Sequence, residues 1–222
     1  MVMILTYLRD HRVIGTQTTG NLPLKAIREV TACFVHPPVL DSTINEHTYR
    51  LKGEDDIWPL LLVHLLANFG SLLEGGRAWH WRLTKEGERF LHYPPVGQIA
   101  FLASIWWKKM DWVIAFPYEG LSKGLPPGFK DTVRIYLQEL LVETHIPSDE
   151  FADELIARTG LTWGAKVEST QTILRGAVYR MVVYVLGYLG MAEIEYRKDK
   201  HATIVSSFKM TAFGRGLLEV ME

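Results

Sequence analysis

The feature that most constrains the fold is an order of elements that occurs twice along the 222 residues. In each copy a long apolar helix is followed by a glycine, a short strand of alternating character, a turn and a second strand. The two helices end at Gly70 and Gly190, and the hairpins are predicted over 72–83 and 191–210. A glycine suits such a helix end because it adopts the left-handed conformation without steric cost. The repeat therefore predicts two units of the same construction.

Both copies also close in the same way, on a threonine that precedes a glycine by three residues and leads into a terminal apolar segment. Further helices are predicted before each hairpin. They cover 1–9, 21–34 (with Asn21 as its cap) and 55–69 in the first unit, and 99–115, 132–144, 148–158 and 167–188 in the second. Two helices ahead of a helix and a hairpin make a winged helix. The predicted fold class is mainly α with small β-hairpin wings, as two winged-helix units in tandem.

The sharpest boundary in the sequence is the adjacent pair Pro94-Pro95. Two consecutive prolines can neither continue a helix nor join a β-ladder, so they indicate a linker. The predicted division is a first winged-helix unit at 1–93, a linker at 94–97 and a second winged-helix unit at 98–222. A second stretch rich in Pro and Gly, 116–129, is predicted to be a long loop of the second unit.

This pattern resembles the winged-helix superfamily over nearly the whole chain. The segment 15–25, which reads Gly-Thr-Gln-Thr-Thr-Gly-Asn-Leu-Pro-Leu-Lys, and the segment 83–87 are similar to a group of uncharacterised prokaryotic winged-helix proteins. The resemblance implies the fold and no particular activity. Many winged helices are helix-turn-helix transcription regulators that bind DNA through the third helix and the wing, and others use these surfaces for protein binding or dimerisation. Function therefore has to be argued from surface residues.

The third helix of the first unit is a poor candidate for reading DNA. It begins with Glu54, Asp55 and Asp56, which repel phosphate, and continues as an almost unbroken apolar run. A helix that is apolar on nearly every side is buried and does not lie in a groove.

The second unit is the better candidate for binding double-stranded DNA. Residues 161–218 contain eight basic and four acidic residues, and polar side chains recur at three- and four-residue steps on the predicted third helix. Such a stripe suits base reading, and a basic wing suits phosphate contacts. The predicted nucleic-acid-binding residues are Lys166, Gln171, Thr172, Arg175 and Tyr179 on or just before the helix, and Arg197, Lys198 and Lys200 on the wing.

The alternative is a protein-binding or homodimerising adaptor that does not bind DNA. Residues 131–160 contain seven acidic and two basic residues, so Arg175 and Arg180 could pair with carboxylates there. The net charge of −1 lacks the basic excess typical of nucleic-acid binding. Aromatic residues are enriched at interfaces, and several occur together. They are Trp106, Trp107, Trp112, Phe116 and Tyr118.

Other chemistries find little support in the sequence. The glycines at 15 and 20 are spaced as in a phosphate loop, but Asn21 stands where the lysine should be. The eight histidines have no zinc-site spacing, and Cys33 lies in an apolar run typical of a buried thiol. We therefore expect no enzyme activity, cofactor, metal or small-molecule site. The longest apolar run has 11 residues, too few to span a membrane, so we expect a cytoplasmic protein without a membrane partner.

Overall fold

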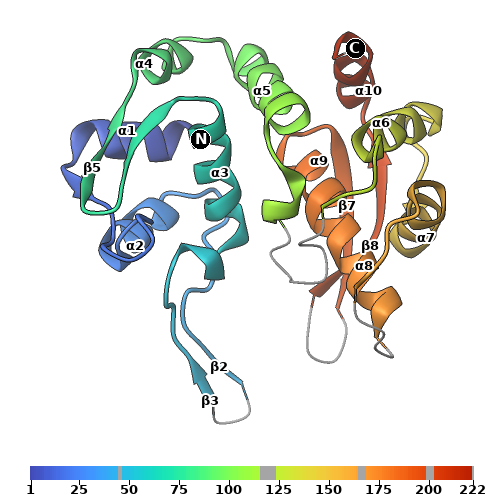
Figure 1. Ribbon diagram of the computed structural model, residues 1–222, viewed down its shortest axis with the longest axis horizontal. Coiled ribbons are helices and arrows are strands. Elements are labelled where there is room, and N and C mark those ends of the chain that lie inside the picture. Colours follow the sequence, from blue (N-terminus) through green and yellow to red (C-terminus); the bar gives the residue numbers. More distant parts are fainter. Residues whose placement is uncertain (45–46, 116–123, 165–168, 199–202, 222) are drawn as a thin grey trace. The chain divides into compact units, whose positions relative to one another are not determined.

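The computed structural model describes residues 1–44, 47–115, 124–164, 169–198 and 203–221. Over these residues the protein is a mixed α/β fold, mostly helical, with two small three-stranded antiparallel sheets and a separate two-stranded hairpin (Figure 1). The chain divides into two compact units, Met1–Met110 and Asp111–Glu222. The division thus falls after Met110, whereas the sequence places a linker at 94–97, between two helices of the first unit.

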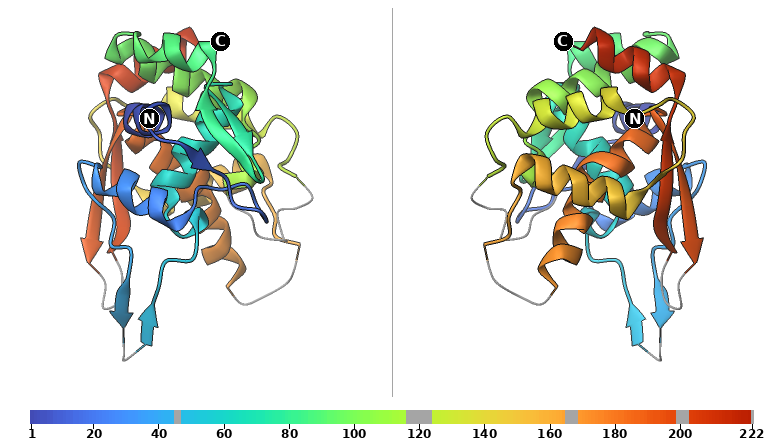
Figure 2. Two further views of the ribbon diagram at one scale, coloured as in Figure 1. Left: turned by 90° about the vertical axis from the view of Figure 1, so that its left-hand side faces the viewer. Right: turned by 90° about the vertical axis from the view of Figure 1, so that its right-hand side faces the viewer.

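The first unit combines helices with one small sheet. Its elements are α1 (Val2–Asp10), β1 (Val13–Ile14), α2 (Leu24–Ala32), β2 (Ser42–Ile44), β3 (His47–Tyr49), the 3-10 turn η1 (Glu54–Asp56), α3 (Trp58–Phe69), β4 (Leu73–Gly76), β5 (Trp79–Leu83), α4 (Lys85–Leu91), α5 (Pro95–Ser104) and the π-helical turn η2 (Ile105–Lys109). The sheet has the order β1-β5-β4. The β2–β3 hairpin extends away from the helices of this unit (Figures 1 and 2).

The second unit repeats this plan. Its elements are the 3-10 turn η3 (Trp112–Ala115), α6 (Phe129–Glu139), β6 (Ile146–Pro147), α7 (Ser148–Thr159), α8 (Thr170–Val178), the π-helical turn η5 (Tyr179–Val183), α9 (Tyr184–Tyr188), β7 (Ala192–Lys198), β8 (Thr203–Met210) and α10 (Ala212–Val220). The sheet has the order β6-β8-β7. In both units the short strand after the first helix pairs with the second strand of the hairpin.

The repeat extends to single hydrogen bonds at the end of each hairpin. Thr84 Oγ1 accepts from the Gly87 N–H at 3.0 Å and donates to the Ser71 carbonyl at 2.6 Å. Thr211 Oγ1 accepts from the Gly214 N–H at 3.0 Å and donates to the Gly190 carbonyl at 3.1 Å. Each threonine therefore caps the last helix of its unit and ties it to the start of the hairpin.

The two predicted hairpins are present, as the antiparallel pairs β4–β5 and β7–β8. The predicted cap of α2 is wrong. Helix α2 begins at Leu24, directly after Pro23, and the Asn21 carbonyl instead accepts a hydrogen bond from the Thr16 N–H within the preceding turn. Gly70 keeps a right-handed φ of −79°, and the left-handed position of this helix end is Ser71, at φ 54°.

The burial of side chains tests three further expectations. Asn68 is the one exposed residue of α3, in keeping with the predicted shielding of this helix. Trp106, Trp107 and Trp112 are buried, at 1%, 7% and 0% exposure, so they are core residues and do not form an exposed aromatic surface. Phe116 and Tyr118 lie outside the described residues. Cys33, expected to be buried, is exposed because it follows the last residue of α2.

Glu54, the first residue of η1, is part of the core of the first unit. Glu54 is fully buried, accepts a hydrogen bond from the Leu22 N–H at 3.0 Å, and pairs with His64 Nδ1 at 2.5 Å. The pair joins the segment before α2 to the middle of α3.

Among the helices of the described segments, none has both the length and the apolar character needed to cross a bilayer.

Candidate interaction surface of the second unit

The polar stripe predicted on the third helix is engaged by the neighbouring helix α7. Arg175 donates from Nε to Asp153 Oδ1 at 2.7 Å, and its Nη1 lies 3.4 Å from Asp149 Oδ2. Gln171 Nε2 donates to Asp153 at 2.6 Å, and the Tyr179 hydroxyl donates to Asp149. The structure thus brings three of the predicted residues together, around two carboxylates of α7.

These contacts stabilise the charged forms of the ion pair. Hydrogen bonds from Arg175 and then Gln171 lower the pKa of Asp153, and the bond to Asp153 raises the pKa of Arg175. Burial, and next the hydrogen bond to Asp149, raise the pKa of the Tyr179 phenol. At neutral pH, Arg175 is therefore a charged residue whose charge is already matched by carboxylates.

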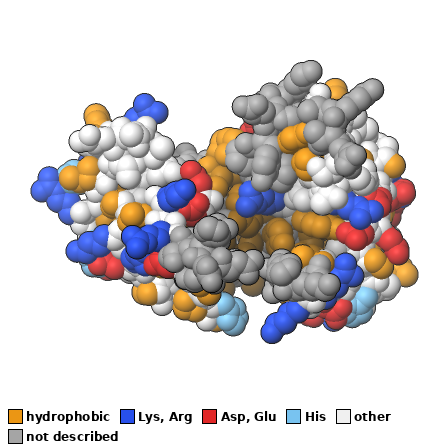
Figure 3. Space-filling model, turned by 90° about the horizontal axis from the view of Figure 1, so that it is seen from below, with side chains coloured by type: hydrophobic (Ala, Val, Ile, Leu, Met, Phe, Trp, Pro, Cys, Tyr) orange, Lys and Arg blue, Asp and Glu red, His pale blue; other side chains and the backbone are white. Residues whose placement is uncertain are grey.

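This arrangement leaves little for a DNA base edge or phosphate to bind on α8. Thr172 is exposed, and Lys166 lies outside the described residues. Asp149 and Asp153, with side chains 52% and 40% exposed, would stand beside an approaching phosphate. The second unit as a whole carries 12 Lys and Arg against 15 Asp and Glu. Among the residues that the structure describes, basic side chains do not gather into one continuous patch on the face drawn in Figure 3.

The wing residues that the structure describes are exposed. Arg197 and Lys198 stand at the end of β7, and neither forms an ion pair with a residue of the described segments. Lys200 lies outside the described residues. These two side chains remain available for a polyanion or for a carboxylate of another protein.

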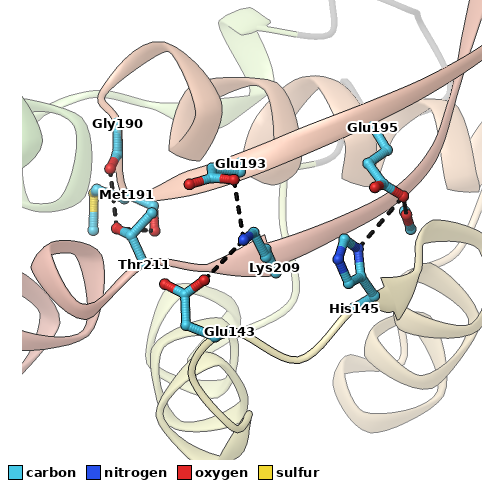
Figure 4. A network of polar contacts seen from close by, with 9 residues as sticks. Glu143, His145, Gly190, Met191, Glu193, Glu195, Lys209 and Thr211 are labelled. Atoms are coloured by element: carbon cyan, nitrogen blue, oxygen red, sulfur yellow. Dashed lines mark hydrogen bonds and ion pairs between the residues drawn. The ribbon is translucent and has the colours of Figure 1, made fainter.

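The outer face of the hairpin carries an ion-pair network (Figure 4). Lys209 Nζ on β8 contacts Glu143 at 2.8 Å and Glu193 at 3.2 Å, and the hydrogen bond to Glu143 leads the causes that raise the pKa of Lys209. Glu195 accepts from the Ser207 hydroxyl at 2.5 Å and lies 3.4 Å from His145 Nδ1. The network fixes the first half of β7 to β8 and to the segment between α6 and α7.

The opposite face of β7 borders a shallow cavity of about 250 Å³, which we name the tyrosine groove. Its lining residues are Tyr184, Gly187, Tyr188, Ala192, Ile194 and Tyr196. Tyr188 and Tyr196 are 51% and 53% exposed, unusually open for large aromatic side chains. Partial burial of the rings raises the pKa of Tyr188 to about 12 and also raises the pKa of Tyr184 and Tyr196.

A glycine sets the depth of the tyrosine groove. A Cβ atom built on Gly187 would lie 2.3 Å from Cδ1 of Ile194, well inside van der Waals contact. A side chain at position 187 would therefore force Ile194 to move, and the glycine allows the present approach of α9 to β7. The tyrosines at 184 and 188 stand one helical turn apart on either side of this glycine, which makes the floor of the groove apolar and its walls aromatic.

Strand β7 is the open edge of its sheet, within the residues that the structure describes. Its pairing runs in order from Ala192 with Met210 to Lys198 with Thr203, and the extra residue of the β-bulge, Ser206, lies on β8. Strand β7 is thus regular over seven residues and has free backbone groups along one side. Ala192, Ile194 and Tyr196 face the tyrosine groove, while alternate residues face the network on the other side.

The tyrosine groove was not predicted from the sequence. One signal was available in the alternation of 192–197, where Ala, Ile and Tyr alternate with Glu, Glu and Arg. The i, i+4 spacing of Tyr184 and Tyr188 was another. The first pattern is also typical of an ordinary amphipathic strand, and the second is typical of a core helix. Only the sheet order shows that β7 is an edge strand and that these residues line a groove beside it.

No group of three or more His, Cys, Asp or Glu side chains in the described segments is arranged to hold a metal ion. Comparisons with protein-family models, curated proteins and solved structures found no match.

Proposed function

We propose that this protein is a non-enzymatic protein-binding module, built from two winged-helix units, and that it binds an extended protein strand at the tyrosine groove and the free edge of β7. The winged-helix assignment is supported by the order of elements in each unit. A helix, a short strand, two helices, a hairpin and a closing helix follow one another, and the short strand pairs with the second hairpin strand.

The observation that carries the proposal is the pair of half-exposed tyrosines beside an unpaired strand edge. A strand added to β7 would gain main-chain hydrogen bonds from the free edge, and its alternate side chains would cover Tyr188 and Tyr196. This is the mode called β-augmentation, in which the backbone supplies affinity and side-chain pockets supply specificity. Tyrosine gives a large contact area with only two side-chain torsions to fix.

A second candidate function is binding of duplex DNA by the wing of the second unit, as in a transcription regulator. It is favoured by the exposure of Arg197 and Lys198. It is weakened by the pairing of Arg175 with Asp149 and Asp153, because the base-reading role predicted for Arg175 would require breaking those contacts. Any duplex binding would then rest on phosphate contacts alone and would carry little sequence preference.

Site-specific photocrosslinking in cells tests the proposed function. The tyrosine analogue p-benzoylphenylalanine is placed at position 188, and, as a matched control, at Leu141, which is 72% exposed in the same unit. We expect protein adducts at position 188 that disappear when Tyr196→Glu is introduced, and none of these adducts at position 141. Equal labelling at both positions, or no adduct at position 188, would overturn the proposal.

Fluorescence anisotropy with a labelled random duplex tests the second candidate. Binding that is lost in the double variant Arg197→Ala/Lys198→Ala and kept in Tyr188→Glu would favour DNA over protein as the ligand. An affinity for duplex DNA that is unchanged in the double variant would show that the wing does not bind DNA.

A further inference from the structure

We propose that the strand which occupies the free edge of β7 is β7 of a second copy of this chain, so that two sheets join across a two-fold axis into one six-stranded sheet. This inference rests on the proposed function, because it names the partner of the same surface. Three features of β7 favour this partner: the order of its charges, the side on which each residue stands, and the apolar groove that the second strand would cover.

Charge is distributed along β7 in two blocks. Glu193 and Glu195 stand in the first half, and Arg197 and Lys198 stand at its end. When a strand pairs with a copy of itself, the two run antiparallel about the two-fold axis, so the acidic half of each faces the basic half of the other. A strand carrying charges of one sign would repel its own copy. Opposite charges directly across an antiparallel pair are favourable, and like charges are unfavourable.

One register places a glutamate of β7 opposite an arginine and keeps the alternation of faces, with Glu193 opposite a position beyond the end of β7. With Tyr196 on the two-fold axis, Glu195 lies opposite Arg197 of the second copy, and the reverse pair forms by symmetry. Residues directly opposite each other share a face, so both pairs lie on the outer side of the joined sheet. Arg197 forms no ion pair within the described segments, which leaves its guanidinium available for this contact. Glu195 keeps further acceptor capacity beside Ser207 and His145.

On the face opposite to these charge pairs, the same register covers the tyrosine groove. Tyr196 would stand against its own symmetry mate, and Ile194 would lie opposite the aliphatic stem of Lys198 of the second copy. These side chains would cover part of Tyr188 and of the ≈ 250 Å³ groove. Apolar and aromatic contacts of this kind are the main source of association free energy, while the charge pairs fix direction and register.

Sedimentation velocity of the full-length chain over a range of concentrations gives the dimer dissociation constant and tests the charge order. In Arg197→Glu, two favourable contacts per dimer become two repulsive ones, and we expect the dissociation constant to rise roughly tenfold. The double variant Glu195→Arg/Arg197→Glu exchanges the charges and is expected to restore dimerisation. Lys25→Glu, at an 86% exposed lysine of the first unit, is the matched control for a change of net charge.

A disulfide trap tests the register independently of affinity. In a Cys33→Ser background, which removes the single cysteine of the chain, Tyr196→Cys is expected to form an intermolecular disulfide under mild oxidation, because position 196 faces itself across the axis. Leu141→Cys in the same background is the control and is expected to remain unlinked. Equal linkage at both positions would contradict the register.

The outcomes separate this inference from the function on which it rests. Suppose that the wild-type chain sediments as a monomer at all concentrations and that position 188 forms adducts with a different protein. This result would contradict the self-pairing of β7 and would still support the protein-binding function. A dimer that is insensitive to Arg197→Glu, or one that Arg197→Glu weakens and the charge exchange does not restore, would likewise rule out this pairing of β7. Thermal unfolding of each variant, compared with that of the wild-type chain, shows whether a loss of dimerisation is due to unfolding.

Discussion

At the scale of the residue, side-chain partners decide what the polar stripe of α8 can do. The spacing of Arg175 and Tyr179 on one helix face, with Gln171 beside that face, could be predicted from the sequence, and so could the presence of an acidic segment near them. Which carboxylates those side chains meet depends on how α7 packs against α8, and no local pattern encodes that packing. The stripe that is typical of a DNA-reading helix is therefore, in this protein, the polar seam between two helices.

The pair Arg175 and Asp153 is expected to contribute modestly to stability. Both side chains are partly exposed, at 31% and 40%, so solvent screens the interaction, and we expect Arg175→Ala and Asp153→Ala each to lower the free energy of unfolding by about 1 kcal/mol. Urea unfolding of the single and double variants in a mutant cycle measures the coupling. The pKa of Asp153 is lowered in the folded protein, so the contribution is present above the ordinary pKa of an aspartate and is lost as pH falls through the folded value. Additive effects would show that the contact is energetically neutral.

The buried pair Glu54 and His64 is expected to matter more. Replacing His64 with Ala would leave a fully buried carboxyl group without its side-chain partner, at a cost of about 3 kcal/mol. His64→Ala and Glu54→Gln should both lower the unfolding midpoint in urea, whereas Lys52→Ala, on an exposed residue two positions away, should not. A stability loss below about 1 kcal/mol for both pair variants would contradict the structural role assigned here.

At the scale of the element, the repeat of helix, hairpin and threonine cap was predictable because it depends on local chemistry. Glycine, threonine and alternating apolar residues act over a few positions. The two-residue strands β1 and β6 could not be predicted, since a strand of two residues has no periodicity and exists only through pairing with a distant hairpin strand. The same limit applies to the open edge of β7. Its sequence is that of any amphipathic strand, and only the sheet order leaves one side unpaired.

The glycine that follows each capping threonine should tolerate no side chain. A Cβ atom on Gly214 would lie 2.1 Å from the Met191 carbonyl oxygen, and one on Gly87 would lie 2.2 Å from the Leu72 carbonyl oxygen. Since backbone would have to move, we expect Gly214→Ala and Gly87→Ala each to destabilise the protein by about 2 kcal/mol, measured by chemical unfolding. Gly216→Ala, where a Cβ would meet no atom within 4 Å, is the control on the same helix as Gly214. Equal stability of all three variants would refute the close packing.

At the scale of the whole molecule, the two units share a hairpin whose second strand pairs with a two-residue strand, but they differ in exposed chemistry. The first has 12 basic and 10 acidic residues, and the second has 12 and 15. Composition predicted the absence of a basic excess, and this agrees with the matched charges found around Arg175. The position of the division could not be predicted from Pro94-Pro95. Pro95 is tolerated in the first turn of α5, where a missing N–H costs nothing, so the pair joins two helices closely.

The charge of the whole chain makes a prediction about duplex DNA. We expect random duplex to bind no tighter than typical non-specific complexes, about 10⁻⁴–10⁻⁶ M at physiological salt, and the affinity to be unchanged in Arg175→Ala. Anisotropy titrations at two salt concentrations measure both. A tenfold loss of affinity in Arg175→Ala would mean that the ion pair with Asp153 opens on binding, and it would revive the base-reading interpretation.

Within the residues that the structure describes, β7 is the long border of the second sheet. Its other border is β6, which has two residues, one of which is Pro147, with no N–H to donate, and which runs directly into α7. An exposed border of a sheet usually invites endless stacking and fibre formation. In the proposed dimer the two β7 strands occupy each other's free edge, so neither stays open to a further strand.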